Sequence, residues 1–109
     1  MIIKELSKYI ERTDVLMMAS EIVSNGTQIV ILYSRPESGK TVVLEKDYVF
    51  NVADGYYKET THHYYKTSSG VRNSTDNYLL LEEMIEEIMN FLDGDLEEGE
   101  SLRVFIETI

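Results

Sequence analysis

Residues 78–106 read YLLLEEMIEEIMNFLDGDLEEGESLRVFI and place two secondary-structure patterns in one stretch. In the first half, apolar residues recur three, four and seven positions apart, which is the spacing of one face of an amphipathic helix. Gly94 is a typical residue just beyond a helix end. In the second half, apolar residues with strand preference predict a short strand over 102–106. The predicted helix covers 78–92 and presents the apolar residues Tyr78, Leu81, Met84, Ile85, Ile88 and Leu92.

Upstream of this stretch, short β-rich segments alternate with turn signals. Asn25-Gly26 is a strong hairpin signal, because both residues tolerate positive φ, and it predicts that 15–24 pairs with 29–33. Residues 67–77 are polar and turn-rich, so they predict an exposed loop. Further strands are predicted at 41–44, at 48–52 and in the Tyr- and Thr-rich segment that follows the turn signal Asp54-Gly55, with a turn or bulge at Glu45–Asp47.

The first residues complete this outline. Ile2, Ile3, Leu6, Tyr9 and Ile10 recur at helical spacing, and they predict a short amphipathic helix that ends near residues 13–14. The chain is therefore expected to be a single α+β domain over 1–109, with two helices packed on a mainly antiparallel sheet of four to five strands. The expected order of elements is close to αββββαβ.

Composition narrows the classes of protein to which the chain can belong. The 109 residues include no Cys, which excludes disulfides, thiolate–zinc sites and cysteine nucleophiles. Hydrophobic residues make up 43% of the chain, enough for a packed core. Charged residues interrupt the start of the chain, and no apolar run approaches the ~20 residues of a membrane span. We therefore expect a cytoplasmic protein with no membrane partner.

Charge is distributed unevenly. Residues 1–72 hold nine Lys or Arg and nine Asp or Glu, whereas residues 73–109 hold one Arg and eleven Asp or Glu. The entire net charge of −10 therefore belongs to the last third of the chain. Such an asymmetry is a signal of interaction rather than of fold.

The sequence contains no catalytic or metal-binding motif. His62 and His63 are neighbours on a predicted strand, so their side chains point to opposite faces and do not share an ion. Asp93, Asp95 and Glu97 have the spacing of a calcium loop, but the Gly and the final Glu that such a loop needs are absent. Gly39-Lys40-Thr41 lacks the first Gly of a phosphate loop and precedes a strand. We therefore expect no enzyme activity, no metal and no cofactor.

Four tyrosines between residues 56 and 72 are interspersed with the basic residues Lys58, Lys66 and Arg72. Aromatic and basic side chains together can stack single-stranded nucleic acid. Glu59 and the acidic last third oppose that interpretation, so no direct nucleic-acid partner is expected. The alternatives for the Tyr56–Tyr65 segment are ordinary core packing and a second protein-binding surface.

The carboxylates between residues 82 and 100 work against the predicted helix. Glu82 and Glu86 form a like-charge pair one turn apart, which destabilises a helix by roughly 0.2–0.5 kcal/mol. Asp93 and Asp95 follow the helix C-terminus, where the macrodipole favours cations. Because folding does not require these charges, we interpret them as a binding surface for a basic protein. The predicted site residues are Glu82, Glu83, Glu86, Glu87, Asp93, Asp95, Glu97, Glu98 and Glu100.

On these nine residues the chain resembles the small, acidic, Cys-free α+β inhibitors encoded by phages and mobile elements. They include anti-CRISPR proteins that block the DNA-binding channel of a Cas nuclease. The resemblance is one of type, without a shared motif, and it implies a non-enzymatic DNA mimic that binds a basic nucleic-acid-processing protein. The alternatives are an immunity protein that neutralises a cognate toxin, a regulatory module that forms a homodimer through Met84, Met89 and Phe91, and a small enzyme or ligand binder that uses His62, His63 and the tyrosines.

Overall fold

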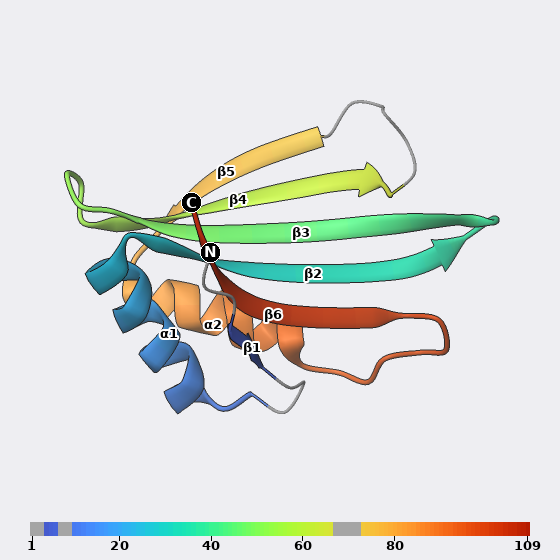
Figure 1. Cartoon of the computed structure of the whole chain (residues 1–109), viewed down its shortest axis with the longest axis horizontal. Coiled ribbons are helices and arrows are strands. Elements are labelled where there is room, and N and C mark those ends of the chain that lie inside the picture. The colour runs from blue at the N-terminus through green and yellow to red at the C-terminus, as the bar shows by residue number, and fades with distance from the viewer. Residues whose placement is uncertain (1–3, 7–9, 67–72) are drawn as a thin grey trace.

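The computed structural model describes residues 4–6, 10–66 and 73–109 as an α+β fold (Figure 1). Within these described residues, six strands form one sheet in the order β1-β6-β2-β3-β4-β5, and all neighbouring strands pair antiparallel. The predicted class and the predicted order αββββαβ are confirmed, preceded by one additional short strand. The strands are β1 (Lys4–Leu6), β2 (Thr27–Glu37), β3 (Lys40–Asn51), β4 (Tyr56–Tyr65), β5 (Asn73–Leu79) and β6 (Ser101–Thr108), and the helices are α1 (Arg12–Asn25) and α2 (Leu81–Leu92).

The first helix lies one segment later than predicted. Val15, Met18, Ala19 and Ile22 are buried at helical spacing, and the predicted strand over 15–24 is therefore wrong. Gly26 adopts φ 61° and donates its backbone N–H to the Ile22 carbonyl at 3.1 Å, which ends α1. A left-handed Gly serves a helix end as well as a hairpin, and here the apolar spacing upstream decides between the two.

The predicted helix over the first residues is wrong at Lys4–Leu6, which forms β1, and at Ile10, which precedes the start of α1 at Arg12. β1 pairs with β6 in the register Lys4 opposite Ile106 and Leu6 opposite Val104. The rest of that prediction, at residues 2–3 and 7–9, lies outside the described residues.

The loop predicted over 67–77 is partly a strand. Asn73–Leu79 pairs with β4, and Asp76 accepts a hydrogen bond from the Thr60 hydroxyl at 2.9 Å. Residues 67–72 lie outside the described residues. Since β5 includes Tyr78 and Leu79, α2 begins at Leu81 rather than at residue 78. Pairing with β4 therefore organises a polar segment that has little strand preference of its own.

The long hairpins in the middle of the chain follow the prediction more closely. β3 continues through Glu45–Asp47, where a turn or bulge was predicted, because it pairs on both sides. The turn at Asp54-Gly55 is confirmed: Gly55 has φ 73° and donates its N–H to the Asn51 carbonyl at 2.8 Å.

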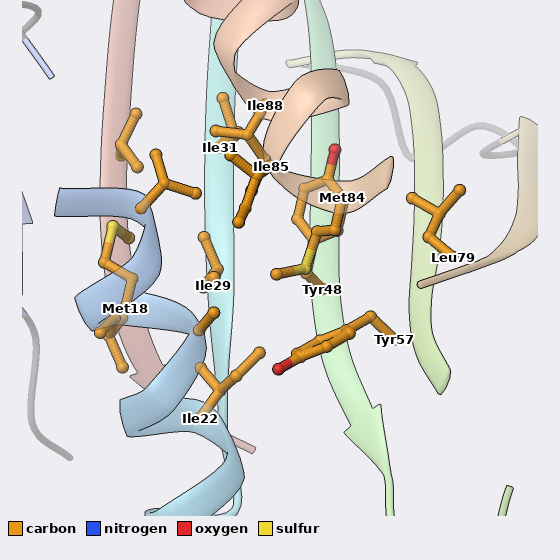
Figure 2. Close-up of a cluster of buried hydrophobic side chains, with 14 residues drawn as sticks. Met18, Ile22, Ile29, Ile31, Tyr48, Tyr57, Leu79, Met84, Ile85 and Ile88 are labelled. Atoms are coloured by element: carbon orange, nitrogen blue, oxygen red, sulfur yellow. The ribbon is translucent and has the colours of Figure 1, made fainter. Parts of the chain in front are cut away.

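Both helices contribute to one hydrophobic core on one face of the sheet (Figures 1 and 2). Met84, Ile85 and Ile88 of α2 and Ile22 of α1 are fully buried against Ile29 and its neighbours on the strands. Side chains alternate between the two faces of a strand, so the residues between the core positions lie on the opposite face. We call this opposite face, which neither helix covers, the open face.

One charged residue is buried with the core. The Glu59 side chain accepts a hydrogen bond from the Tyr48 hydroxyl at 2.6 Å and lies 3.7 Å from Lys46 Nζ. Burial and the neighbouring Glu59 carboxylate raise the pKa of Tyr48, so Tyr48 stays protonated in the folded protein. The Glu59 charge, which the sequence suggested would repel nucleic acid, is instead part of the interior.

Candidate functional site

The nine predicted carboxylates lie on the side of α2 that faces away from the core and on the segment that leads to β6. We call these nine residues the acidic surface. On α2, residues one turn apart share a face, so the four Glu residues lie together opposite the buried Met84, Ile85 and Ile88. Asp93, Asp95, Glu97 and Glu98 are exposed on the following segment, and Glu100 is partly buried.

Three of the nine carboxylates have partners within the fold. Glu82 pairs with Arg12 of α1, and both side chains are exposed. Glu83 accepts a hydrogen bond from the Leu80 backbone N–H at 2.9 Å, so it caps the start of α2. Glu100 accepts hydrogen bonds from the Tyr33 hydroxyl and from the Glu97 N–H. These three groups contribute to folding, which corrects the inference that the helix requires none of the nine.

The observed start of α2 also changes which carboxylates oppose the helix dipole. Because the helix begins at Leu81, Glu82 and Glu83 lie in the first turn, where negative charge is favourable. Asp93 terminates the helix, and the last turn contains no basic residue. The electrostatic cost therefore falls on the C-terminal end of α2 and not on its start.

Six carboxylates remain without a basic partner among the described residues. Each is exposed, and no Lys, Arg or His in the described part of the chain lies within ion-pair distance of them. We call this subset the unpaired carboxylates: Glu86, Glu87, Asp93, Asp95, Glu97 and Glu98.

An open groove of about 610 Å³ lies beside the C-terminal end of α2. Its apolar lining comes from Ile10, Met89, Leu92, Leu96 and Leu102, and Asp93 and Asp95 also line it. Gly94 between these two acids has φ 112°, a conformation that side chains rarely adopt. Apolar surface and negative charge therefore occur together at this end of the acidic surface.

The carboxylates do not converge on a calcium loop. Asp93, Asp95 and Glu97 lead into β6 rather than into a second helix, as the sequence predicted. Within the described residues, the ligand atoms of one group of three acidic or His side chains lie within 4.8 Å of one another, and that group is Glu45, Asp47 and His62.

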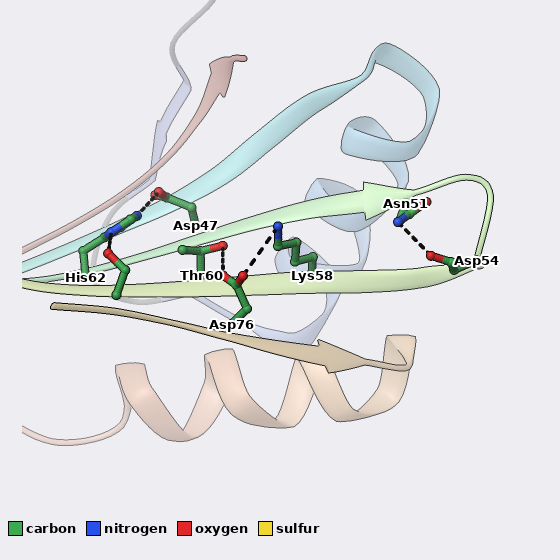
Figure 3. Close-up of polar contacts among 8 residues, drawn as sticks. Asp47, Asn51, Asp54, Lys58, Thr60, His62 and Asp76 are labelled. Atoms are coloured by element: carbon green, nitrogen blue, oxygen red, sulfur yellow. Dashed lines mark hydrogen bonds and ion pairs between the residues drawn. The ribbon is translucent and has the colours of Figure 1, made fainter. Parts of the chain in front are cut away.

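Sequence reasoning missed this second cluster. His62 and His63 do point to opposite faces, as predicted, since register places His63 opposite Leu44 and His62 opposite Glu45. His62 thereby reaches the open face, where its Nε2 lies 3.2 Å from Asp47 Oδ2 (Figure 3). The available signal was the i, i+2 spacing of Glu45 and Asp47, which places both on one face of a strand. The turn or bulge predicted at residues 45–47 does not keep the two side chains on one face, whereas the continuous strand does.

The tyrosines between 56 and 65 divide between the two faces. Tyr57 is buried in the core, whereas Tyr64 donates a hydrogen bond to Glu45 at 2.9 Å on the open face. Tyr56 and Tyr65 are 42% and 45% exposed, but they belong to opposite faces. The second binding surface suggested for this segment is therefore not one continuous tyrosine patch.

Comparisons of the chain with protein-family models, with curated proteins and with solved structures found no match. Among the described residues, neither helix has the length and apolar character that crossing a membrane requires.

Proposed function

We propose that the protein is a non-enzymatic inhibitor that binds a basic, nucleic-acid-processing protein, for example a Cas nuclease, through the acidic surface. The observation that carries the proposal is the set of six unpaired carboxylates, which are exposed and have no basic partner among the described residues. A basic groove supplies the missing counter-charges and steers association, and the acidic surface repels acidic partners.

The spacing of the charges supports a DNA mimic. Duplex DNA presents one negative charge per ~1.7 Å of its axis, and a helix rises ~1.5 Å per residue. Glu82 is paired with Arg12, and Glu83, Glu86 and Glu87 still place three charges along ~6 Å of helix, a density close to that of a duplex. The segment from Asp93 to Glu98 extends the same field beyond the helix end.

The groove at the end of α2 implies that the proposed partner carries more than basic charge. Its apolar lining offers a place for a Leu, Met or aromatic side chain, with Asp93 and Asp95 beside it. Interfaces obtain most of their affinity from such buried anchors, while surrounding charges contribute specificity and association rate. We infer a partner surface that carries an apolar side chain among Lys and Arg.

A toxin-neutralising immunity protein would use the same surface, and the two functions differ only in the enzyme that is inhibited. The homodimer alternative is weaker, since Met84 is fully buried and Met89 and Phe91 pack against the protein's own core. The proposal places the protein in the cytoplasm, where nucleic-acid-processing enzymes act.

The test is affinity capture from the source organism at low and high salt, followed by nuclease assays on the captured protein. The variant Glu86→Lys/Glu87→Lys/Glu97→Lys/Glu98→Lys keeps the capping residue Glu83 and should lose the partner. We expect capture at low salt, weaker capture at high salt, and inhibition of the captured enzyme by the wild-type chain. Equal capture by the wild type and the variant would overturn the proposal.

A matched control separates local charge from net charge. Glu87→Lys/Glu98→Lys and Glu37→Lys/Asp54→Lys change the formal charge by the same amount, but Glu37 and Asp54 lie outside the acidic surface. Only the first pair should reduce affinity for the captured enzyme, by about tenfold or more. Equal losses in both pairs would show that net charge alone drives association.

A further inference from the structure

The open face holds a compact group of metal-ligating side chains, separate from the acidic surface. Glu45 and Asp47 are two residues apart on β3 and share a face, and register places His62 of β4 directly opposite Glu45. One ligand atom from each of the three lies within 4.8 Å of the other two. The Asp47 and His62 side chains are only 16% and 18% exposed, so the group is partly shielded from water.

Neighbouring hydroxyls hold two of these ligands in place. His62 Nδ1 lies 2.6 Å from the Ser74 hydroxyl on β5, which leaves Nε2 directed toward Asp47 (Figure 3). The Tyr64 hydroxyl donates to Glu45 Oε1 at 2.9 Å. Contacts of this kind, in which the second nitrogen of a His and a carboxylate oxygen are hydrogen-bonded, orient ligands in metal sites.

The neutral ring of His62 has two tautomers. With the proton on Nε2, His62 donates to Asp47 Oδ2 and accepts from the Ser74 hydroxyl. With the proton on Nδ1, it donates to Ser74 and directs the Nε2 lone pair toward Asp47 Oδ2, which is the arrangement that binds a metal ion between the two atoms. The Glu45 carboxylate then supplies the third ligand from the same strand face.

We propose that Glu45, Asp47 and His62 form a binding site for a divalent first-row transition-metal ion of the Zn²⁺ type. The ligand set is one imidazole nitrogen and two carboxylate oxygens, with water completing the coordination. Metal–ligand distances of 2.0–2.2 Å separate tetrahedral ligands by roughly 3.3–3.6 Å. The contact between Asp47 and His62 is already at 3.2 Å, and the ligand atom of Glu45 lies within 4.8 Å of the other two, so Glu45 is the side chain that has to move on metal binding.

The nitrogen ligand sets the expected selectivity. Mg²⁺ and Ca²⁺ prefer sites made entirely of oxygen atoms, whereas imidazole favours Zn²⁺ and its neighbours. Exposed carboxylates elsewhere on the chain offer only oxygen ligands, which give no such preference. Selectivity for Zn²⁺ over Mg²⁺ that depends on His62 therefore separates this site from weak association with the acidic surface.

The experiment is calorimetric titration of the EDTA-treated full chain with ZnCl₂ and, separately, with MgCl₂. We expect one Zn²⁺ site, with Mg²⁺ binding at least about 100-fold more weakly. His62→Ala should weaken Zn²⁺ binding by at least about tenfold. The matched control His63→Ala removes the exposed neighbouring ring on the opposite face and should leave the affinity unchanged. Glu97→Gln/Glu98→Gln should also leave it unchanged.

A second measurement keeps the test independent of how the variants fold. In the wild-type chain labelled with ¹⁵N, Zn²⁺ should shift the Nε2 resonance of His62 and leave that of His63 in place. Equal Zn²⁺ affinity in His62→Ala and wild type, or equal shifts at both rings, would overturn the proposal. Because the site lies on the open face, its failure says nothing about the acidic surface, and the converse also holds.

Discussion

Two regions of this protein carry carboxylates, and they differ in whether those carboxylates have partners within the fold. On the open face and in the interior behind it, three carboxylates have partners: Asp47 faces His62, Asp76 faces Lys58 and Thr60, and buried Glu59 binds Tyr48. On the acidic surface, six carboxylates project into solvent without a basic partner among the described residues. The two regions lie on opposite sides of one sheet.

The difference teaches which charges serve the fold and which are available to another molecule. A carboxylate that is buried must be paired or hydrogen-bonded, since desolvating an isolated charge is costly. An exposed carboxylate needs no partner to remain ionised, and a surface of them raises the affinity for cations at long range. Substitutions in the first group should therefore change stability, and substitutions in the second should change binding.

The largest expected effect is at Glu59. Glu59→Ala removes the carboxylate partner of Lys46, whose side chain is only 15% exposed. It also removes the acceptor of the Tyr48 hydroxyl. We expect a loss of about 3–5 kcal/mol in the free energy of unfolding, measured by urea denaturation. Glu98→Ala on the acidic surface is the control and should change stability little. A change in Glu59→Ala as small as that of the control would break the comparison.

Alkaline pH should destabilise the buried contact between Tyr48 and Glu59. The pKa of Tyr48 is raised in the folded protein, so folding disfavours the phenolate that the unfolded chain forms above its ordinary pKa of about 10. Stability contributed by Tyr48 is present below pH 10 and is lost as pH rises above it, by up to about 1.4 kcal/mol per pH unit. The melting temperature, measured from pH 8 to 11, should fall less steeply with pH for Tyr48→Phe than for the wild type. Parallel curves for the two proteins would contradict the prediction.

The partly exposed pair of Asp76 and Lys58 on the open face should contribute less to stability than Glu59 does. Asp76 lies 3.7 Å from Lys58 and accepts a bond from Thr60, but the two charged side chains are 36% and 46% exposed. Solvent screens such pairs, so Asp76→Ala should lower stability by about 1 kcal/mol. Thermal unfolding at low and high salt measures it, and the effect should shrink at high salt. No dependence on salt would assign the loss to the Thr60 bond alone.

The smallest effect, of opposite sign, is expected on α2. Glu86→Gln/Glu87→Gln removes repulsion with Glu82 and Glu83 one turn earlier, while the cap at Leu80 is retained. We expect a gain of about 0.2–0.5 kcal/mol per pair, measured by urea denaturation, together with weaker binding to the captured partner. A loss of stability would show that these two carboxylates serve the fold after all.

The sequence predicted some elements well because their signals are local. The apolar stripe of α2, the final strand and the turn at Asp54-Gly55 each depend on residues within a few positions of one another. The location of α1 was missed because Asn25-Gly26 suits two structures, and β5 was missed because its polar residues are ordered by pairing with β4. The correct order of elements was reached with these two segments assigned differently.

The candidate sites show the same difference between local signals and contacts that join distant parts of the chain. Sequence alone determined the class of fold and the excess of carboxylates after residue 72, because charge and apolar spacing depend on neighbouring positions in the chain. The structure decided which six of the nine predicted carboxylates remain unpaired, since it gives Glu82, Glu83 and Glu100 partners. Tertiary structure alone decided that Glu83 and Glu100 hold the fold together, that Glu59 is buried and that His62 meets Glu45 and Asp47. Those contacts depend on strand register and helix placement, which are set by packing between residues distant in the chain.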